Sequence, residues 1–242
     1  MASKSEKARE RAERAAATLA AQKKREQRRR ILSIVGVVVA IAVIIGVALG
    51  ISLTRGSTKV DAPVSSSYDL AIGPKNAPHT VVIYEDFLCP YCQAFESASR
   101  DGLAKLAADG KVRVEYRPFH FLQPDYSLEA LNAFAVVKGA YPTGDVAKKF
   151  HDLLYENQPD EQGPFPSMDS LVDLAVQAGA EKSKVEDAIK ATDSEQSWTD
   201  KATAEANNAG VQSTPTVLLD GKLYQQGTSV EDLATNLIKQ LS

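Results

Sequence analysis

A run of 23 residues without a charged side chain divides this 242-residue sequence into two unequal parts. The run extends from Ile31 to Leu53 and consists mostly of valine, isoleucine, leucine, alanine and glycine. At about 1.5 Å per residue, a helix of this length spans the roughly 30 Å hydrocarbon core of a bilayer. In lipid every backbone polar group must pair within its own segment, so such a run has to be helical there. We therefore predict a transmembrane helix over residues 31–53.

Two alternatives to a membrane-spanning helix stay open for this run. A buried helix of a soluble domain seldom extends this far without a polar face. A cleaved signal peptide has an apolar region of about 7–15 residues behind a short basic head, and both parts are longer here. Cleavage is the stronger of the two alternatives.

Charge is distributed unevenly on the two sides of the apolar run. Residues 1–30 contain 11 Lys and Arg against 4 Asp and Glu, whereas residues 54–242 contain 17 against 27. The positive-inside rule places the basic side in the cytoplasm and the acidic side beyond the cell membrane. We predict a basic cytoplasmic segment (1–30), a flexible Ser/Thr-rich linker (54–67) and a folded domain (68–242). The acidic domain argues against nucleic-acid binding.

The predicted domain alternates between strand and helix patterns. His79–Phe87 is rich in β-branched and aromatic residues and predicts a buried strand. A helix from Pro90 to about Ala108 and a second strand over Lys111–Phe119 follow. Residues 124–209 show helical periodicity and predict four or five short helices, after which Pro215–Gly221 predicts a strand that opens a hairpin. With a last helix at the end of the chain, the pattern predicts an α/β fold.

The only two cysteines, Cys89 and Cys92, enclose Pro90 and Tyr91 at the predicted start of the first helix. Pro90 suits the first helical position and so places Cys89 at the helix cap. Unpaired backbone N–H groups and the helix dipole favour a thiolate there. We expect Cys89 to be exposed and acidic and to exchange disulfides with substrates. Cys92, one turn later, would resolve the mixed disulfide.

Two other uses of such a cysteine pair are less consistent with the sequence. A structural zinc site needs four ligands, but a second Cys-x-x-Cys is absent from the sequence, and His79, His120 and His151 show no ligand spacing. A structural disulfide that closes so short a loop would contribute little stability. We therefore predict a reversible dithiol/disulfide pair without a metal or a cofactor, in a compartment where disulfides persist.

Three stretches together resemble the DsbA family of thioredoxin-fold thiol–disulfide oxidoreductases, in particular its membrane-anchored actinobacterial members. They are DFLCPYC at residues 86–92, the helical block at about residues 124–209, and STPTVLLDGK at residues 213–222. The resemblance implies a thioredoxin fold with a helical insertion. It also implies that Pro215 is a cis-proline beside the cysteines and that the Thr214 backbone pairs with an incoming substrate strand. The alternative for Pro215 is an ordinary proline at a strand entry.

The sequence departs from the family pattern before the first cysteine. Many thioredoxin-fold proteins carry a buried carboxylate six residues before that cysteine, where this chain has Ile83. Glu85 and Asp86 follow within three positions, and Glu85 shares the strand face of Ile83 because a strand alternates its faces. Both carboxylates are candidate proton-relay groups for Cys92, and Glu85 is the preferred one.

We therefore predict a membrane-tethered, extracytoplasmic oxidoreductase that forms disulfides in exported proteins. Its substrates would be unfolded or folding proteins with cysteines, and a partner in the membrane would reoxidise it. A reductase or isomerase on the same fold is the first alternative, because glutaredoxins share the Pro-Tyr dipeptide and isomerase relatives share the Thr before the cis-proline. A redox-inactive binding or chaperone module is the alternative from another class, and the intact cysteine pair argues against it.

Overall fold

The computed structural model describes residues 59–123 and 125–242. The predicted basic segment, the predicted transmembrane run and the first part of the predicted linker lie outside these residues, so they stay predictions. In the described part of the chain, no helix combines the length and apolar character that a bilayer crossing requires.

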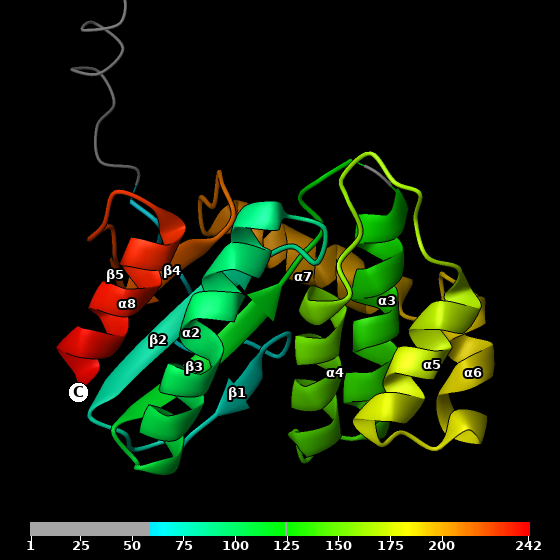
Figure 1. Ribbon diagram of the computed structural model, residues 1–242, viewed down its shortest axis with the longest axis horizontal. Coiled ribbons are helices and arrows are strands. Elements are labelled where there is room, and N and C mark those ends of the chain that lie inside the picture. Colours follow the sequence, from blue (N-terminus) through cyan, green and yellow to red (C-terminus); the bar gives the residue numbers. More distant parts are fainter. Residues whose placement is uncertain (1–58, 124) are drawn as a thin grey trace, which may run out of the picture. The chain divides into compact units, whose positions relative to one another are not determined.

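In the described part of the chain, two strands, a helix and a strand precede a block of helices, and a hairpin and a last helix follow that block (Figure 1). In order they are β1 (Leu70–Ile72), β2 (His79–Glu85), α2 (Pro90–Ala108), β3 (Val112–Pro118), α3 (Asp125–Ala140), α4 (Asp145–Glu156), α5 (Met168–Ala178), α6 (Lys182–Lys190), α7 (Gln196–Asn208), β4 (Thr216–Leu219), β5 (Lys222–Leu223) and α8 (Val230–Leu241).

The strands form one mixed sheet in the order β1-β3-β2-β4-β5. β2 and β3 are parallel, with Ile83 opposite Tyr116, and α2 supplies the crossover that a parallel pair needs. β4 is antiparallel to β2, with Val217 opposite Ile83, and continues into the predicted hairpin with β5. The predicted strand–helix–strand unit is therefore confirmed. The sequence did not predict β1, because three residues are too few to show an alternation.

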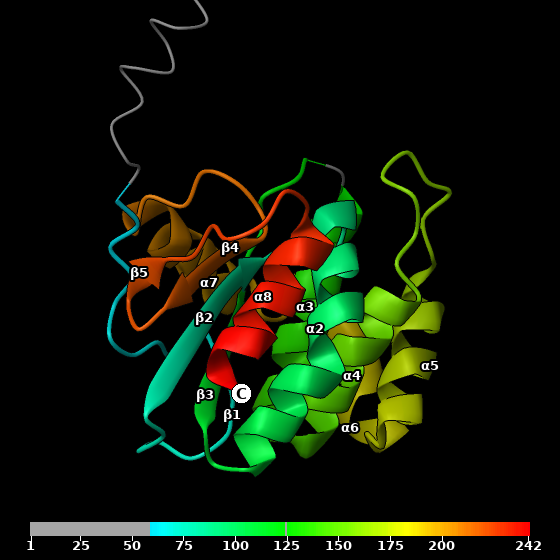
Figure 2. The same ribbon diagram turned by 60° about the vertical axis from the view of Figure 1, so that its left-hand side comes forward.

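Helices cover both faces of the sheet, as the two views in Figures 1 and 2 show. α2 and α8 pack against each other on one face, over a core that contains Ile83 and Phe95. On the other face α7 covers a smaller apolar cluster that includes Val82, Tyr84 and Leu218. Since β2 is buried on both faces, its sequence is an almost continuous apolar run.

The helical insertion packs mainly around α3. This helix contacts α4, α5, α6 and α7, and most of its residues from Ala130 to Val137 are buried. Figures 1 and 2 show α3 to α6 gathered beside one end of the sheet. The prediction of four or five short helices over residues 124–209 is confirmed by α3 to α7.

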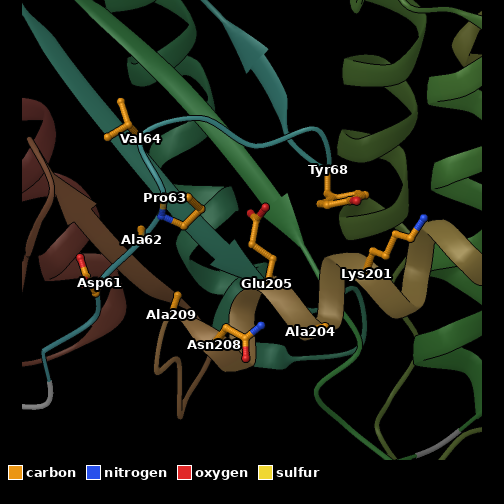
Figure 3. A pocket seen from close by; sticks show the side chains of 10 residues that line it. All are labelled: Asp61, Ala62, Pro63, Val64, Tyr68, Lys201, Ala204, Glu205, Asn208 and Ala209. Atoms are coloured by element: carbon orange, nitrogen blue, oxygen red, sulfur yellow. The ribbon is translucent and has the colours of Figure 1, made fainter.

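Residues 59–68 lie along α7 before the first strand begins. The Asp61 N–H donates to the Ala209 carbonyl at 2.9 Å, and the Arg117 guanidinium donates to the Pro63 carbonyl at 3.0 Å. Figure 3 shows the hollow between this segment and α7, which has a volume of ≈ 670 Å³ and contains neither cysteine. The second part of the predicted linker is thus held against the domain.

Candidate active site

The cysteine pair lies where β2 passes into α2. Cys89 is the N-cap of α2 in an extended conformation, with φ −74° and ψ 118°, and Pro90 follows in the first turn. The Cys89 carbonyl accepts hydrogen bonds from the N–H groups of Cys92 and Gln93 at 3.0 and 3.1 Å. Both cysteines are free thiols in this structure. The helix begins at the residue where the sequence predicted it.

Cys89 is less accessible than the sequence predicted, and the expectation of an exposed residue is wrong. Only 4% of Cys89 and 1% of Cys92 is exposed. The carbonyl of Thr214 lies 3.5 Å from the Cys89 sulfur, and Gln158, just after α4, donates to the Cys89 carbonyl at 3.1 Å. Distant segments therefore fold over the helix start, whereas Tyr91 between the cysteines is 64% exposed.

The two thiols differ strongly in acidity. A hydrogen bond from Cys92, helped by Thr214 and by the N–H groups of Tyr91 and Cys92, lowers the pKa of Cys89 to about 6 against the opposing effect of burial. Burial, the hydrogen bond to Cys89 and the negative charge of Glu85 raise the pKa of Cys92 well above its ordinary value. At neutral pH the pair therefore holds a Cys89 thiolate beside a protonated Cys92.

The segment before β4 completes the surroundings of Cys89. The peptide bond between Thr214 and Pro215 is cis, as the resemblance implied. Because β4 pairs with β2, the sheet brings Thr214 to the helix start that follows β2. The Thr214 carbonyl accepts from the Cys89 sulfur, while the Thr214 hydroxyl is buried without a hydrogen-bond partner.

Asp86, one of the two candidate relay carboxylates, holds loops together. Its Oδ1 accepts from the Leu88 N–H at 2.8 Å, and its Oδ2 accepts from the N–H groups of Phe121 and Leu122 and from the Ser127 hydroxyl at 2.7 to 2.9 Å. Four donors therefore converge on this one carboxylate. The geometry therefore makes Asp86 a structural residue that joins the active-site loop to the start of α3.

Glu85, the other candidate, is fully buried and paired with a histidine from the insertion. Its Oε1 lies 2.6 Å from His151 Nε2, and neither side chain is exposed. Burial opposes a charged imidazole, but the Glu85 carboxylate and a hydrogen bond to Asp152 raise the pKa of His151 to about 9. Burial and the charge of Glu85 raise the pKa of Glu96 to about 7.

Glu96, His151 and Asp152 also form the one group in the described residues that has metal-ligand geometry, with ligand atoms within 4.8 Å of one another. Both nitrogens of His151 are already bonded to carboxylates, at 2.6 and 3.1 Å. The cations of Lys148 and Arg100 lie beside Asp152. The donors of His151 and Asp152 are thus occupied, whereas both buried carboxylate oxygens of Glu96 have no hydrogen-bond partner in the described residues.

Sequence reasoning missed Glu96, His151, Asp152 and Gln158 as parts of this site. Glu96 lies four residues after Cys92 on the same helix face, a spacing that could have indicated it. His151 lies 66 positions from Glu85, and nothing local indicates that pairing.

Three comparisons place the chain among known proteins. The family model described as "Thioredoxin" matches residues 65–239. The chain belongs to this family. Disulfide bond formation protein D of Bacillus subtilis (strain 168) is 27% identical over 190 residues, which cover 77% of this chain and 83% of that protein.

Solved structures agree with the family assignment. BdbD from Bacillus subtilis in its oxidised form superposes with a TM-score of 0.65 at 24% identity over 76% of this chain and 98% of that one, which supports the fold. Reduced DsbA from Mycobacterium tuberculosis gives a TM-score of 0.60 at 27% identity over 72% and 92%. The predicted thioredoxin fold with a helical insertion, the resemblance to DsbA-like proteins and the prediction of a thiol–disulfide oxidoreductase are confirmed.

Proposed function

We propose that this oxidoreductase is membrane-tethered and extracytoplasmic and forms disulfides in exported proteins through Cys89 and Cys92. The observation that carries the proposal is the unequal acidity of the two thiols at the start of α2. A stabilised Cys89 thiolate is a good leaving group, so a mixed disulfide with substrate is readily resolved in favour of the substrate disulfide.

The reaction proceeds in two exchanges. A substrate thiolate attacks the Cys89 sulfur of the Cys89–Cys92 disulfide, and Cys92 leaves and takes up a proton. A second substrate thiolate then attacks the substrate sulfur of the mixed disulfide and displaces Cys89 as a thiolate. The backbone of Thr214 pairs with the substrate strand beside Cys89, and Pro215 holds that segment in place.

The location follows from segments outside the described residues. The apolar run 31–53 anchors the chain, and the basic residues 1–30 keep its N-terminus in the cytoplasm. The substrates are unfolded or folding exported proteins with cysteines, and a membrane protein returns Cys89 and Cys92 to the disulfide.

The first test measures the reduction potential of the purified full chain in glutathione buffers. A value near −120 mV, as for strong disulfide oxidants, supports an oxidase, whereas a value near −270 mV, typical of thioredoxin, makes the chain a reductase. A reversible couple with an intermediate potential favours an isomerase. Absence of any reversible couple would reject redox function and favour a binding module.

A trapping experiment tests the residue roles. Cys92→Ser should accumulate mixed disulfides with disulfide-containing substrate proteins, because its Cys89 thiolate attacks a substrate S–S bond and the resolving thiol is gone. Cys89→Ser should accumulate none and should lose turnover. Equal behaviour of the two variants would contradict the assignment of Cys89 as the attacked sulfur.

A further inference from the structure

A glutamine from the helical insertion bonds the backbone of the active-site turn. This turn runs from Asp86, directly after β2, to Cys89 at the start of α2. Gln158, which follows α4, donates from Nε2 to the carbonyls of Phe87 and Cys89, at 2.9 and 3.1 Å. One amide nitrogen carries two hydrogens, so a single side chain can serve both carbonyls.

These two bonds join the end of the strand to the first turn of the helix. Among the described residues, no other donor bonds the Phe87 carbonyl. The Cys89 carbonyl also accepts from the N–H groups of Cys92 and Gln93 in α2, at 3.0 and 3.1 Å. The helix start therefore cannot rotate relative to the strand end without breaking a bond to Gln158. Because the peptide planes on both sides of a Cα set the direction of its Cβ, this restraint also fixes where the Cys89 sulfur points.

Gln158 is itself held in place. Its N–H donates to the Tyr155 carbonyl at 3.4 Å, and the same carbonyl accepts from the Gln93 side chain of α2 at 2.9 Å. Further along the loop between α4 and α5, the ring of Phe165 stacks on Tyr126 of α3, with centroids 5.6 Å apart and planes at 9°. The loop is thus attached before and after its amide contact with the turn, which preorganises the side chain for its two bonds.

The direction of the Cys89 sulfur affects how fast it exchanges disulfides. Cys89 is only 4% exposed, so a small part of its surface faces a reaction partner. Exchange requires the attacking sulfur to approach in line with the bond that breaks. A carbonyl that turned towards the sulfur would also repel the thiolate, which the N–H groups of Tyr91 and Cys92 stabilise.

We propose that Gln158 is a positioning residue for Cys89. By bonding the carbonyls of Phe87 and Cys89, it keeps the sulfur in the direction that disulfide exchange requires and prevents both carbonyls from turning towards it. The inference rests on the proposed role of Cys89 as the sulfur that exchanges with other molecules. Gln158 acts through the backbone of the turn rather than on the reacting atoms.

A residue that merely covered Cys89 would have the opposite effect on the rate. Removal of a cover exposes the sulfur and speeds up its reaction. Removal of a positioning residue slows the reaction even though access to the sulfur improves. The sign of the rate change therefore separates the two roles, and loss of stability alone does not.

The test compares Gln158→Met with Asn157→Leu in the full chain. Methionine has a length similar to that of glutamine but no hydrogen-bond donor. Asn157 is the matched control, because its side chain also donates to a carbonyl, that of Leu153 at 2.9 Å. In the described residues Asn157 has no hydrogen bond to the active-site turn.

The assay measures the reaction of the reduced protein with excess glutathione disulfide from pH 5 to 9. Samples are quenched in acid, and mass spectrometry follows the loss of the reduced protein. In the first step the Cys89 thiolate attacks one sulfur of glutathione disulfide, a bond forms between these two sulfurs, the S–S bond of glutathione disulfide breaks, and a glutathione thiolate leaves.

In Gln158→Met the rate at the high-pH plateau, where Cys89 is fully ionised, should fall about tenfold, since a 1 Å misplacement of reacting groups can cost about 10²-fold. The midpoint of the pH profile should also lie at higher pH than in the wild type. Asn157→Leu should match the wild type in plateau and midpoint. A folded Gln158→Met protein with an unchanged or faster plateau would overturn the positioning role.

A second variant covers the case in which Gln158→Met does not fold. Gln158→Ala leaves room for water, which can bond the two carbonyls but does not tie them together, so the plateau should fall by at least about threefold. An unchanged or faster plateau in this variant would also overturn the proposal. If the wild-type protein does not react with glutathione disulfide, the proposed disulfide exchange itself is wrong, and the two failures are thereby distinguished.

Discussion

Replacing Cys92 tests what makes Cys89 acidic. The hydrogen bond from Cys92 is the largest contribution that lowers the pKa of Cys89 to about 6. A hydrogen bond to a charged group contributes about 1.5–3 kcal/mol, and a tenfold change in acidity corresponds to about 1.4 kcal/mol. Cys92→Ala should therefore raise the Cys89 pKa to about 7–8, and the thiolate fraction at pH 7 should fall from about 90% to about 10–50%.

The assay follows the thiolate absorbance at 240 nm and the rate of alkylation by iodoacetamide against pH. Cys92→Ser is the matched control, since its hydroxyl keeps a donor and should raise the pKa of Cys89 by less than Cys92→Ala does. Cys89→Ala provides the baseline, because the Cys89 transition must vanish in it. A Cys89 pKa of about 6 in Cys92→Ala would refute the reasoning and assign the acidity to the backbone N–H groups of the helix start.

The same pKa links the stability of the reduced form to pH. Unfolding returns the Cys89 thiol to an ordinary pKa of about 9. The contribution of the thiolate to the free energy of unfolding is therefore complete above pH 9, and it is lost as the pH falls through about 6. It amounts to about 4 kcal/mol at its maximum, about 1.4 kcal/mol at pH 7 and almost nothing at pH 5. Urea unfolding of the reduced chain against Cys89→Ala at pH 5 and 7 should show this difference, and equal differences at both pH values would contradict it.

Three further substitutions test the structural supports of the site. Arg117→Ala should release the segment around Pro63 and make it sensitive to limited proteolysis, whereas equal protection would contradict its attachment. Gly73→Ala should destabilise the fold by more than about 1 kcal/mol in urea unfolding, because φ is +83° and a Cβ would lie 2.3 Å from the Val112 carbonyl. Ser127→Ala removes one of the four donors of the buried aspartate and should lower the free energy of unfolding by about 1 kcal/mol; an unchanged value would show that the bond is not needed.

Local patterns predicted the elements that carry the cysteines. β2 is buried on both faces, and Pro90 marks the start of the helix a few residues after it, so both the strand and the cap could be identified from nearby residues. The helical insertion was predicted for a similar reason, since a 3.6-residue period is visible within each of its helices. The parallel pairing of β2 with β3 and the β4–β5 hairpin then follow from the crossover helix and the terminal turn.

Contacts between distant segments could not be predicted in the same way. The covering of Cys89 by Thr214 and Gln158 joins residues 125 and 69 positions apart, and the Glu85–His151 pair joins residues 66 positions apart. Such pairs depend on the orientation of packed helices, which periodicity does not encode. The expectation of an exposed Cys89 failed for this reason.

The attachment of the active-site loop to late parts of the chain has a consequence for synthesis. Cys89 acquires its full acidity only after Thr214, 125 positions further along, has folded against it. Until then the Cys89 thiol of a nascent chain lacks this contribution, and a smaller fraction of it is thiolate at neutral pH. The newly made protein is therefore less reactive towards disulfides of its neighbours while it is still being produced, and it becomes fully reactive only when its own fold is complete.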